Sequence, residues 1–307
     1  MLGYLFPGQG TVRVGMGAWL RRRPVARDRL DEIDAMLSRP ISPLCARGPL
    51  DRLVSTEHAQ VAVTACNLAA LAVLTEEGYE PAIVAGHSVG ELTALHAAGA
   101  LTLAATVRLV ETRSRLMAEA GRGEGPAVRG GMRAVMGLPV ERVEELAEAA
   151  AAPGEPAVVA LENAPGHVVV SGAVAALDRL ERLAADATKI VPLKVGDAYH
   201  SPLMAAAVPA WAAAVAVAEM REPRVPVVPN VSGEPTTDPG TLRQALVAQL
   251  TGRVRWTRTV GAIDAVAPGV EVGDSKVLAG LSRRAGARCL SLADPATLRR
   301  LAREVAA

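Results

Sequence analysis

Short apolar segments and longer helical segments alternate over the first third of the chain. Residues 2–6 form an apolar run that ends in a Pro-Gly pair, as in a buried strand followed by a tight loop. A helical pattern from about residue 58 to 78 leads into a second apolar run at residues 82–85. Helical periodicity then returns at residues 89–98 and 103–120. This alternation predicts a mainly parallel sheet in an α/β fold.

A glycine-rich segment at residues 121–126 marks the start of a second unit, because glycine disfavours continuation of a helix. From Gly131 the pattern reads strand, helix, strand, strand, helix, strand, which is the βαββαβ order of a ferredoxin-like subdomain. The six elements are expected at residues 132–138, 140–151, 157–162, 168–171, 173–187 and 189–195.

The chain after Gly196 is expected to return to the first unit. Helical patterns around residues 203–220 precede a predicted strand at 225–231, and later helices are expected near Leu242 and Leu278. The sequence therefore predicts a large α/β subdomain of residues 1–127 and 197–307. Residues 128–196 form the small ferredoxin-like subdomain.

Composition narrows the class of protein. Half of the 307 residues are apolar, but only one Phe, three Tyr and three Trp are present, so Ala, Val and Leu must fill most of the core. The formal net charge is +1 and the basic residues are scattered. This distribution excludes a strong electrostatic footprint for nucleic acid.

Cysteine usage and the apolar segments predict a cytoplasmic location. Cys45, Cys66 and Cys289 are far apart and outside any metal-ligand spacing, as expected of reduced, buried thiols. The first residues contain no basic leader before an apolar stretch. The most apolar stretch, residues 59–74, is interrupted by polar residues and is short for a bilayer span, so we expect a buried helix. No metal, nucleic-acid or membrane partner is expected.

Gly86-His87-Ser88-Val89-Gly90 matches the G-x-S-x-G pattern of a nucleophile elbow. It lies between a predicted strand and a predicted helix, where that turn is required. Its glycines permit a sharp turn that exposes Ser88 Oγ, and the following helix aims backbone N–H groups at any oxyanion formed there. The alternative is a glycine-flanked turn with an incidental serine. The flanking order favours a nucleophile.

A serine needs a base, and the five histidines are the usual candidates. His87 lies inside the elbow, where adjacent side chains point apart, so a supporting role is expected. His58 and His96 lie on predicted helices and His167 begins a strand, which favours structural or surface roles. His200 lies on the loop that returns to the large subdomain, at a predicted cleft. Position favours His200 as the base, although spacing alone leaves a structural role open.

Arg113 is predicted to face inward on its helix. At about 100° per residue, the charged residues Arg108, Glu111, Arg115 and Glu119 share one stripe, while Arg113 lies roughly 140° from Arg108. A buried guanidinium needs a carboxylate partner. That partner is either a buried Asp or Glu or an acidic substrate bound through two hydrogen bonds.

Several segments taken together closely resemble the malonyl-CoA:acyl-carrier-protein transacylases and the polyketide-synthase acyltransferase domains. These are Phe6-Pro-Gly-Gln-Gly, Gly86-His-Ser-Val-Gly-Glu, Arg113 and the Ala-Tyr-His-Ser-Pro-Leu-Met segment at residues 198–204. Further matching pieces are Asn163-Ala-Pro, Asn230-Val, Ala248-Gln-Leu and Lys276-Val-Leu. The similarity spans essentially the whole chain.

The resemblance implies a fold and a reaction. The fold is an α/β-hydrolase-like large subdomain with a ferredoxin-like insertion, in agreement with the predicted element order. The reaction is transfer of a malonyl group from coenzyme A to the phosphopantetheine thiol of an acyl carrier protein, in fatty-acid or polyketide synthesis. Malonyl-CoA is then a substrate, and no bound cofactor is expected.

The resemblance also implies roles for individual residues. Ser88 is the nucleophile and His200 its base, oriented by the backbone carbonyl of Gln249 in place of a triad acid. Gln9 and Val89 supply the oxyanion-hole N–H groups. The same resemblance makes Arg113 the group that binds the malonyl carboxylate.

Two positions bear on acyl specificity. In polyketide relatives an aromatic residue immediately before the active histidine resembles malonyl selectors, whereas a Ser resembles methylmalonyl selectors. Tyr199 occupies this position and favours malonyl, although one methyl group contributes only about 1–3 kcal/mol of discrimination. Asp197 departs from the family pattern, so a substituted malonyl group stays open.

A second departure lies at Gly273-Asp274-Ser275, where the family usually has Gly-Pro-Gly. We expect this change to reshape the surface that faces the carrier. Nearby Lys276, Arg283 and Arg284 form either a docking patch for an acidic carrier or solvated surface charges.

Two rival functions remain from the sequence. An editing acyl hydrolase of the same fold would use the same Ser and His on acyl carriers, but water attack needs no carboxylate clamp such as Arg113. A catalytically silent scaffold that only docks carriers is disfavoured by the intact Ser88, His200 and Gln9.

Overall fold

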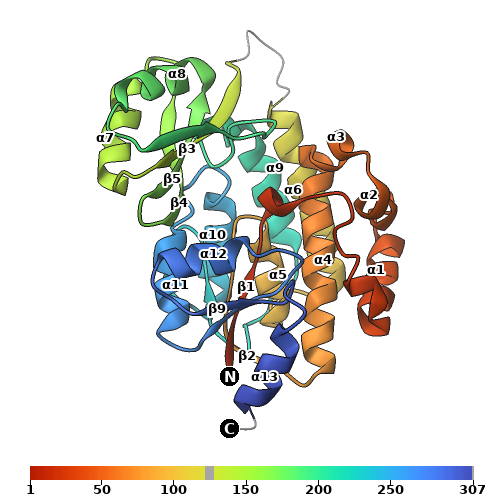
Figure 1. Ribbon diagram of the computed structural model, residues 1–307. Coiled ribbons are helices and arrows are strands. Elements are labelled where there is room, and N and C mark those ends of the chain that lie inside the picture. Colours follow the sequence, from red (N-terminus) through yellow and green to blue (C-terminus); the bar gives the residue numbers. More distant parts are fainter. Residues whose placement is uncertain (122–127, 306–307) are drawn as a thin grey trace.

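The computed structural model describes residues 1–121 and 128–305. Within them the strands form two separate sheets, one of five and one of four strands, and Figure 1 shows the smaller sheet with its helices above the larger one. The predicted glycine-rich linker lies outside the described residues except for Gly121, the last residue of helix α6 (Leu103–Gly121). The predicted boundary at residue 127 also lies outside them.

The five-stranded sheet is parallel throughout, with strand order β7-β2-β1-β8-β9. Its strands are β1 (Leu2–Phe6), β2 (Pro81–Gly86), β7 (Val227–Val228), β8 (Gly269–Glu271) and β9 (Cys289–Ser291). Strand β1 is buried along its whole length. Tyr4 and Phe6 join the main core, whereas Leu5 joins a separate core on the opposite face. The prediction of an α/β fold with a mainly parallel sheet is confirmed.

Helices cover both faces of this sheet. The second core contains residues of α11 (Trp256–Asp264) and α12 (Val277–Arg284), and the main core contains those of α4 (Thr56–Glu76), α5 (Gly90–Ala97) and α6. The remaining helices are α1 (Pro24–Met36), α2 (Ser42–Arg47), α3 (Leu50–Leu53), α9 (Val208–Val217), α10 (Pro239–Ala248) and α13 (Thr297–Val305). Short 3-10 helices span Gln9–Thr11, Leu20–Arg22 and Pro202–Ala207.

Helix α4 is buried without interruption from Ala59 to Leu74. Its length and composition would suffice to cross a membrane, but 89% of its most apolar window is buried inside the protein. It is apolar around its whole circumference because neighbouring elements surround it. The predicted buried helix is confirmed.

The four-stranded sheet is antiparallel, with strand order β4-β5-β3-β6. Along the chain it reads β3 (Gly130–Met136), α7 (Val140–Ala150), β4 (Ala157–Ala164), β5 (His167–Ala173), α8 (Val174–Leu183) and β6 (Lys189–Pro192). This is the predicted βαββαβ order. Alternate residues of β3 separate its two faces: Val135 packs in the core with α7 and α8, whereas Met132 and Ala134 face the large subdomain.

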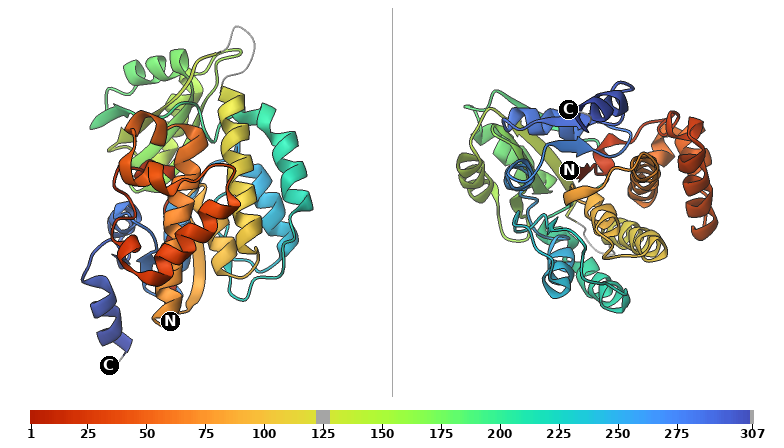
Figure 2. Two further views of the ribbon diagram at one scale, coloured as in Figure 1. Left: turned by 90° about the vertical axis from the view of Figure 1, so that its right-hand side faces the viewer. Right: turned by 90° about the horizontal axis from the view of Figure 1, so that it is seen from below.

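The strand predicted at residues 225–231 is only two residues long in the structure. Pro226 and Pro229 flank Val227 and Val228, and proline has no N–H to donate to a strand neighbour. The N-terminal residue and helix α13, the last helix that the structure describes, lie on the side away from the four-stranded sheet (Figures 1 and 2).

The departure from the family pattern at Gly273-Asp274-Ser275 places a buried carboxylate in this loop, and its effect on the surface that faces the carrier stays a prediction. Its side chain is 3% exposed and accepts hydrogen bonds from Gly17 N at 2.7 Å and Trp19 Nε1 at 3.0 Å. Arg13 forms an ion pair with the same carboxylate at 2.8 Å. Asp274 therefore fixes the loop that follows β1, because a buried carboxylate needs such partners.

Candidate active site

Ser88 sits at the tip of a strained turn between β2 and α5. Its φ is 53°, in the left-handed region. A Cβ on Gly86 would lie 2.0 Å from the backbone of Gly90, and a Cβ on Gly90 would lie 2.2 Å from Phe6 O. Both glycines are therefore required by close backbone approach. The turn places Ser88 beyond the carboxyl end of β2, as the sequence motif predicts.

The side chain of Asn230 holds both ends of this turn. Its Oδ1 accepts from Ser88 N at 2.7 Å, and its Nδ2 donates to Gly86 O at 2.6 Å. Asn230 is fully buried. Because one partner can only donate and the other can only accept, the orientation of this amide is fixed.

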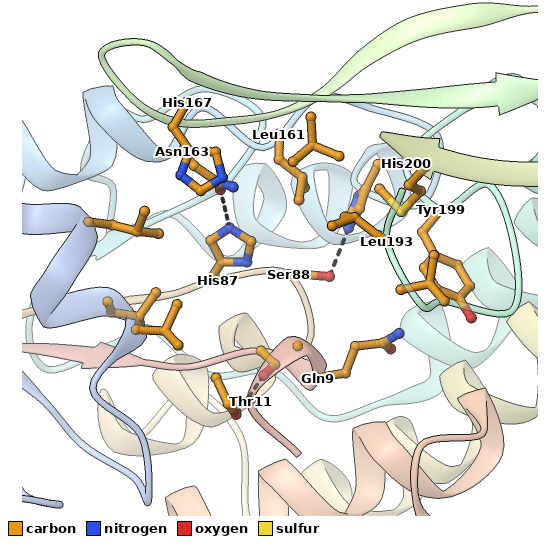
Figure 3. Close-up of a pocket in the computed structure, with 18 of the residues that line it drawn as sticks. Gln9, Thr11, His87, Ser88, Leu161, Asn163, His167, Leu193, Tyr199 and His200 are labelled. Carbon is orange, nitrogen blue, oxygen red and sulfur yellow. Dashed lines mark hydrogen bonds between the residues drawn. The ribbon is translucent and has the colours of Figure 1, made fainter. Parts of the chain in front are cut away.

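Ser88 Oγ lies 2.8 Å from His200 Nε2 (Figure 3). His200 Nδ1 lies 2.8 Å from the backbone carbonyl of Gln249, which can only accept a hydrogen bond. Nδ1 therefore carries the proton, and Nε2 is left to accept from the serine. Burial and the nearby charge of Arg113 lower the His200 pKa to about 3, so the imidazole is neutral at physiological pH.

Arg113 points inward, as the helix pattern predicts, and is only 1% exposed. It donates to Gln60 Oε1 at 2.5 Å, to Gln249 Oε1 at 2.8 Å and to Ser88 Oγ at 3.3 Å. None of the residues that the structure describes forms an ion pair with it. Burial lowers the Arg113 pKa to about 10, and the charge of Glu91 opposes that shift.

Glu91 is a buried carboxylate directly beneath the elbow. Its Oε2 accepts from Asn230 N at 2.9 Å and from Gln249 Nε2 at 2.7 Å. Burial raises the Glu91 pKa to about 7, while these hydrogen bonds and Arg113 act in the opposite direction. One carboxylate thus contacts both residues that hold Ser88 and His200 in place.

Ser88 and His200 open into a single cavity of about 310 Å³. Leu161 and Leu193 extend toward this cavity from the small subdomain (Figure 3). Its apolar lining residues are Met117, Met132, Leu161, Val169, Leu193, Val195, Val277, Leu278 and Leu281. Such walls keep water away from a reactive ester.

Gln9 lines the same cavity opposite Ser88 (Figure 3), and Val89 is the next residue after the serine. The backbone N–H of neither residue donates to an acceptor within the described residues. Each precedes or begins a helical turn, where N–H groups have no partner inside the helix. Both groups are thus available to an oxyanion.

The structure separates the two residues expected to set specificity. Tyr199 lines the cavity, and its hydroxyl is hydrogen-bonded to Thr56 Oγ1. Asp197 is not among the described residues that line the cavity; its carboxylate lies against Gly121 and Gly130. A direct contact between Asp197 and the acyl group is therefore unsupported.

His87 lines the cavity but points away from His200. Its Nε2 lies 2.9 Å from Asn163 Oδ1, and its ring packs edge-on against Trp256 with centroids 5.1 Å apart. Burial lowers the His87 pKa. It connects the elbow to strand β4 of the small subdomain, as a supporting role requires.

Sequence reasoning assigned no role to several residues at this site. Gln60, Glu91 and Asn230 are fully buried polar residues. Gln60 accepts from Arg113, Asn230 accepts from Ser88 N, and Glu91 accepts from Asn230 N and Gln249 Nε2. A polar residue inside an apolar helix, such as Gln60, is a usable signal, because a buried amide must have partners. His167 was expected to be structural or superficial, yet it lines the cavity from the start of β5.

Lys276, Arg283 and Arg284 line a second cavity of about 540 Å³. It shares His167, Val277 and Leu281 with the cavity that contains Ser88. A basic surface therefore adjoins the opening of the candidate active site.

Comparisons with known proteins agree with this geometry. The acyl transferase domain family matches residues 3–283. The malonyl CoA-acyl carrier protein transacylase of Bacillus subtilis is 33% identical over 304 residues, covering 97% of this chain and 95% of that protein. An acyl-carrier-protein S-malonyltransferase structure from Bartonella henselae has a TM-score of 0.92 at 34% identity, covering 100% of both chains. A malonyl-transacylase in complex with its type II PKS acyl-carrier protein has a TM-score of 0.88 at 34% identity, covering 94% of each chain.

Proposed function

The chain belongs to the acyl transferase domain family, and from this we propose that it transfers a malonyl group from coenzyme A to an acyl carrier protein through an ester on Ser88. One observation carries the proposal: Ser88 Oγ lies 2.8 Å from His200 Nε2 and 3.3 Å from the buried guanidinium of Arg113. A hydroxyl with a base and an adjacent cation suits an acyl group that ends in a carboxylate. The names of the relatives support malonyl-CoA as donor and a carrier protein as acceptor.

In the first half-reaction His200 Nε2 takes the proton of Ser88, and the serine oxygen attacks the thioester carbonyl. The oxyanion of the tetrahedral intermediate accepts hydrogen bonds from the backbone N–H groups of Gln9 and Val89. Each such donor is typically worth about 3–4 kcal/mol in the transition state. Collapse of the intermediate releases the coenzyme A sulfur, which receives the proton from His200.

In the second half-reaction the phosphopantetheine thiol of the carrier gives its proton to His200 and attacks the seryl ester. Ser88 leaves and regains the proton. The acyl-enzyme must persist until the carrier arrives, and the apolar lining of the cavity supports this persistence. The backbone carbonyl of Gln249 orients His200 throughout, in the place of a triad acid.

The remaining site residues act on substrate choice and geometry. Arg113 holds the malonyl carboxylate, and Tyr199 limits the room beside it. Asp197 acts on specificity only through its neighbour Tyr199. His87 supports the elbow through Asn163.

The two subdomains have different tasks in this proposal. Residues 1–127 and 197–307 carry the nucleophile and base, and residues 128–196 close the cavity with the face of the four-stranded sheet. Lys276, Arg283 and Arg284 dock an acidic carrier beside the opening. The reaction calls for no bound cofactor, and a cytoplasmic location agrees with the free state of all three cysteines.

Incubation with radiolabelled malonyl-CoA and a phosphopantetheinylated carrier tests the function. Transfer predicts label on the protein that moves to the added carrier. Rapid release of free malonate would instead indicate a hydrolase. A protein that takes up no label but still binds the carrier would be a scaffold.

A further inference from the structure

The charge of Arg113 needs a counter-charge inside the protein, and the structure shows where that charge lies. The guanidinium contacts two neutral amides, Gln60 and Gln249, and the hydroxyl of Ser88. An unbalanced buried charge would be strongly unfavourable. Glu91 is the carboxylate that acts on Arg113, and it is fully buried.

The Gln249 amide separates these two charges. Its Oε1 accepts from Arg113 at 2.8 Å, and its Nε2 donates to Glu91 Oε2 at 2.7 Å. The reverse orientation would place the amide hydrogens against the cation and the amide oxygen against the carboxylate. The bridge therefore has one stable orientation, with the amide dipole aligned between opposite charges.

The separation matters for a substrate that ends in a carboxylate. A protein carboxylate in direct contact with Arg113 would form an ion pair and occupy the N–H groups that the substrate carboxylate needs. Here only three of the five N–H groups of the guanidinium have acceptors within the described residues. Both hydrogens of the Arg113 nitrogen that faces Ser88 are in use, on Gln249 Oε1 at 2.8 Å and on Ser88 Oγ at 3.3 Å. A ligand carboxylate beside Ser88 would therefore replace the longer of these hydrogen bonds, the one to the serine hydroxyl.

We propose that Glu91 is the counter-ion of Arg113, placed behind the Gln249 amide so that it balances the guanidinium without competing with the substrate carboxylate. Glu91 is thus a positioning residue that acts through Gln249 and Arg113 and does not touch the substrate. This inference rests on the proposed malonyl transfer and adds a residue that affects how strongly Arg113 binds the malonyl carboxylate.

The position of Glu91 supports this assignment over a purely structural one. Oε2 accepts both of its hydrogen bonds, and Oε1 has no hydrogen-bond partner within the described residues. A glutamine could therefore keep both accepted bonds with its single oxygen. The two hydrogen bonds therefore do not require a charged residue at this position, and the negative charge of Glu91 needs a separate explanation.

Moving the charge tests the proposal. The experiment compares kcat/KM for malonyl-CoA and acetyl-CoA at about pH 8 in the wild type, Glu91→Gln, Gln60→Glu and the double variant Glu91→Gln/Gln60→Glu. The double variant keeps the net charge but places the carboxylate where Gln60 contacts Arg113. Glu119→Gln, which neutralises an exposed carboxylate on α6, is the matched control.

We expect the malonyl-to-acetyl preference to rise about tenfold in Glu91→Gln, because a nearby negative charge no longer repels the substrate carboxylate. In the double variant the malonyl-to-acetyl preference should fall at least about tenfold below that of the wild type, because the carboxylate at position 60 is then in direct contact with Arg113. Malonyl-CoA should also raise the melting temperature more in Glu91→Gln than in the wild type, because the substrate then supplies the missing anion. Acetyl-CoA should raise the melting temperature equally in the two proteins, because it carries no free carboxylate.

An equal loss of both activities in the variants, with the preference unchanged, overturns the proposal in favour of a structural role. If variants at Glu91 do not fold, Gln60→Glu alone decides: retained acetyl transfer with weakened malonyl transfer supports the proposal, and an unchanged preference overturns it. A wild-type protein that moves no malonyl group to a carrier defeats the proposed function itself, before any variant is compared.

Discussion

Ser88 Oγ lies 2.8 Å from His200 Nε2, and both residues have left-handed backbone conformations, with φ of 53° at Ser88 and 57° at His200. They are the only non-glycine residues with positive φ in the part of the chain that the structure describes. Such a conformation costs about 1–3 kcal/mol and persists only where surrounding contacts enforce it. Asn230 enforces it at Ser88, and the Gln249 carbonyl fixes the ring of His200. The strain therefore falls on the two groups that are proposed to react.

Replacing Arg113 with Ala should separate malonyl from acetyl transfer. The lost interaction is with the substrate carboxylate, so kcat/KM for malonyl-CoA should fall about 10- to 100-fold, and acetyl transfer should be spared or improved. Arg108→Ala removes an exposed arginine from the same helix and should change neither rate. Equal losses for both acyl groups in Arg113→Ala would defeat the assignment.

Replacing Asn230 with Leu should slow the transfer of both acyl groups alike. Leucine is similar in size and adds no charge, but both the acceptor for Ser88 N and the donor to Gly86 O are lost. We expect kcat/KM to fall about 10- to 100-fold with both thioesters, because the elbow is no longer held. The malonyl-to-acetyl preference should stay constant. A changed preference would mean that Asn230 acts on the acyl group instead.

Gly86→Ala should prevent formation of the elbow. Its Cβ would lie 2.0 Å from the backbone of Gly90, so the turn has to open. We expect loss of activity and a large fall in melting temperature. Gly261→Ala on α11 is the matched control, since no atom lies within 4 Å of its added Cβ. That change should stabilise the protein by about 0.5–1 kcal/mol. Normal activity in Gly86→Ala would contradict the role of the turn.

The lowered pKa of His200 makes a testable contribution to stability. The His200 pKa falls from its ordinary value of 6.5, which applies in the unfolded chain, to about 3 in the folded protein. As the pH falls below 6.5, the unfolded chain therefore binds this proton before the folded protein does. The stability that depends on neutral His200 is complete above pH 6.5 and is lost as the pH falls toward 3.

Urea unfolding of the wild type and His200→Asn over this pH range measures that contribution. The wild type should lose stability relative to the variant by at most about 1.4 kcal/mol per pH unit. A difference between the two proteins that does not change with pH would contradict the buried, neutral imidazole.

Local patterns were sufficient to predict much of the fold. The strand before Ser88, the long helix α4 and the βαββαβ order were readable because each has a clear period or glycine boundary. Strands β8 and β9 were not predicted. Each has three residues, too few to show alternation. Strand β8 pairs in parallel with β1 from the other end of the chain, and β9 then pairs with β8.

The candidate site was only partly readable. The elbow and the inward face of Arg113 follow from local spacing. The contacts of Glu91 with Asn230 and Gln249 join segments 139 and 158 residues apart, and no local pattern encodes such a contact. Asp274 illustrates the same limit: this polar loop residue is buried by contacts with a segment far away in the sequence, and no local pattern indicates that burial.

The central claim is that Ser88 carries the acyl group between donor and carrier. Mass spectrometry of the protein after brief exposure to malonyl-CoA tests it directly. The account predicts one added malonyl group on the peptide that contains Ser88, its disappearance when carrier is added, and no adduct in Ser88→Ala. Undiminished malonyl transfer by Ser88→Ala, or an adduct on a different residue, would contradict it.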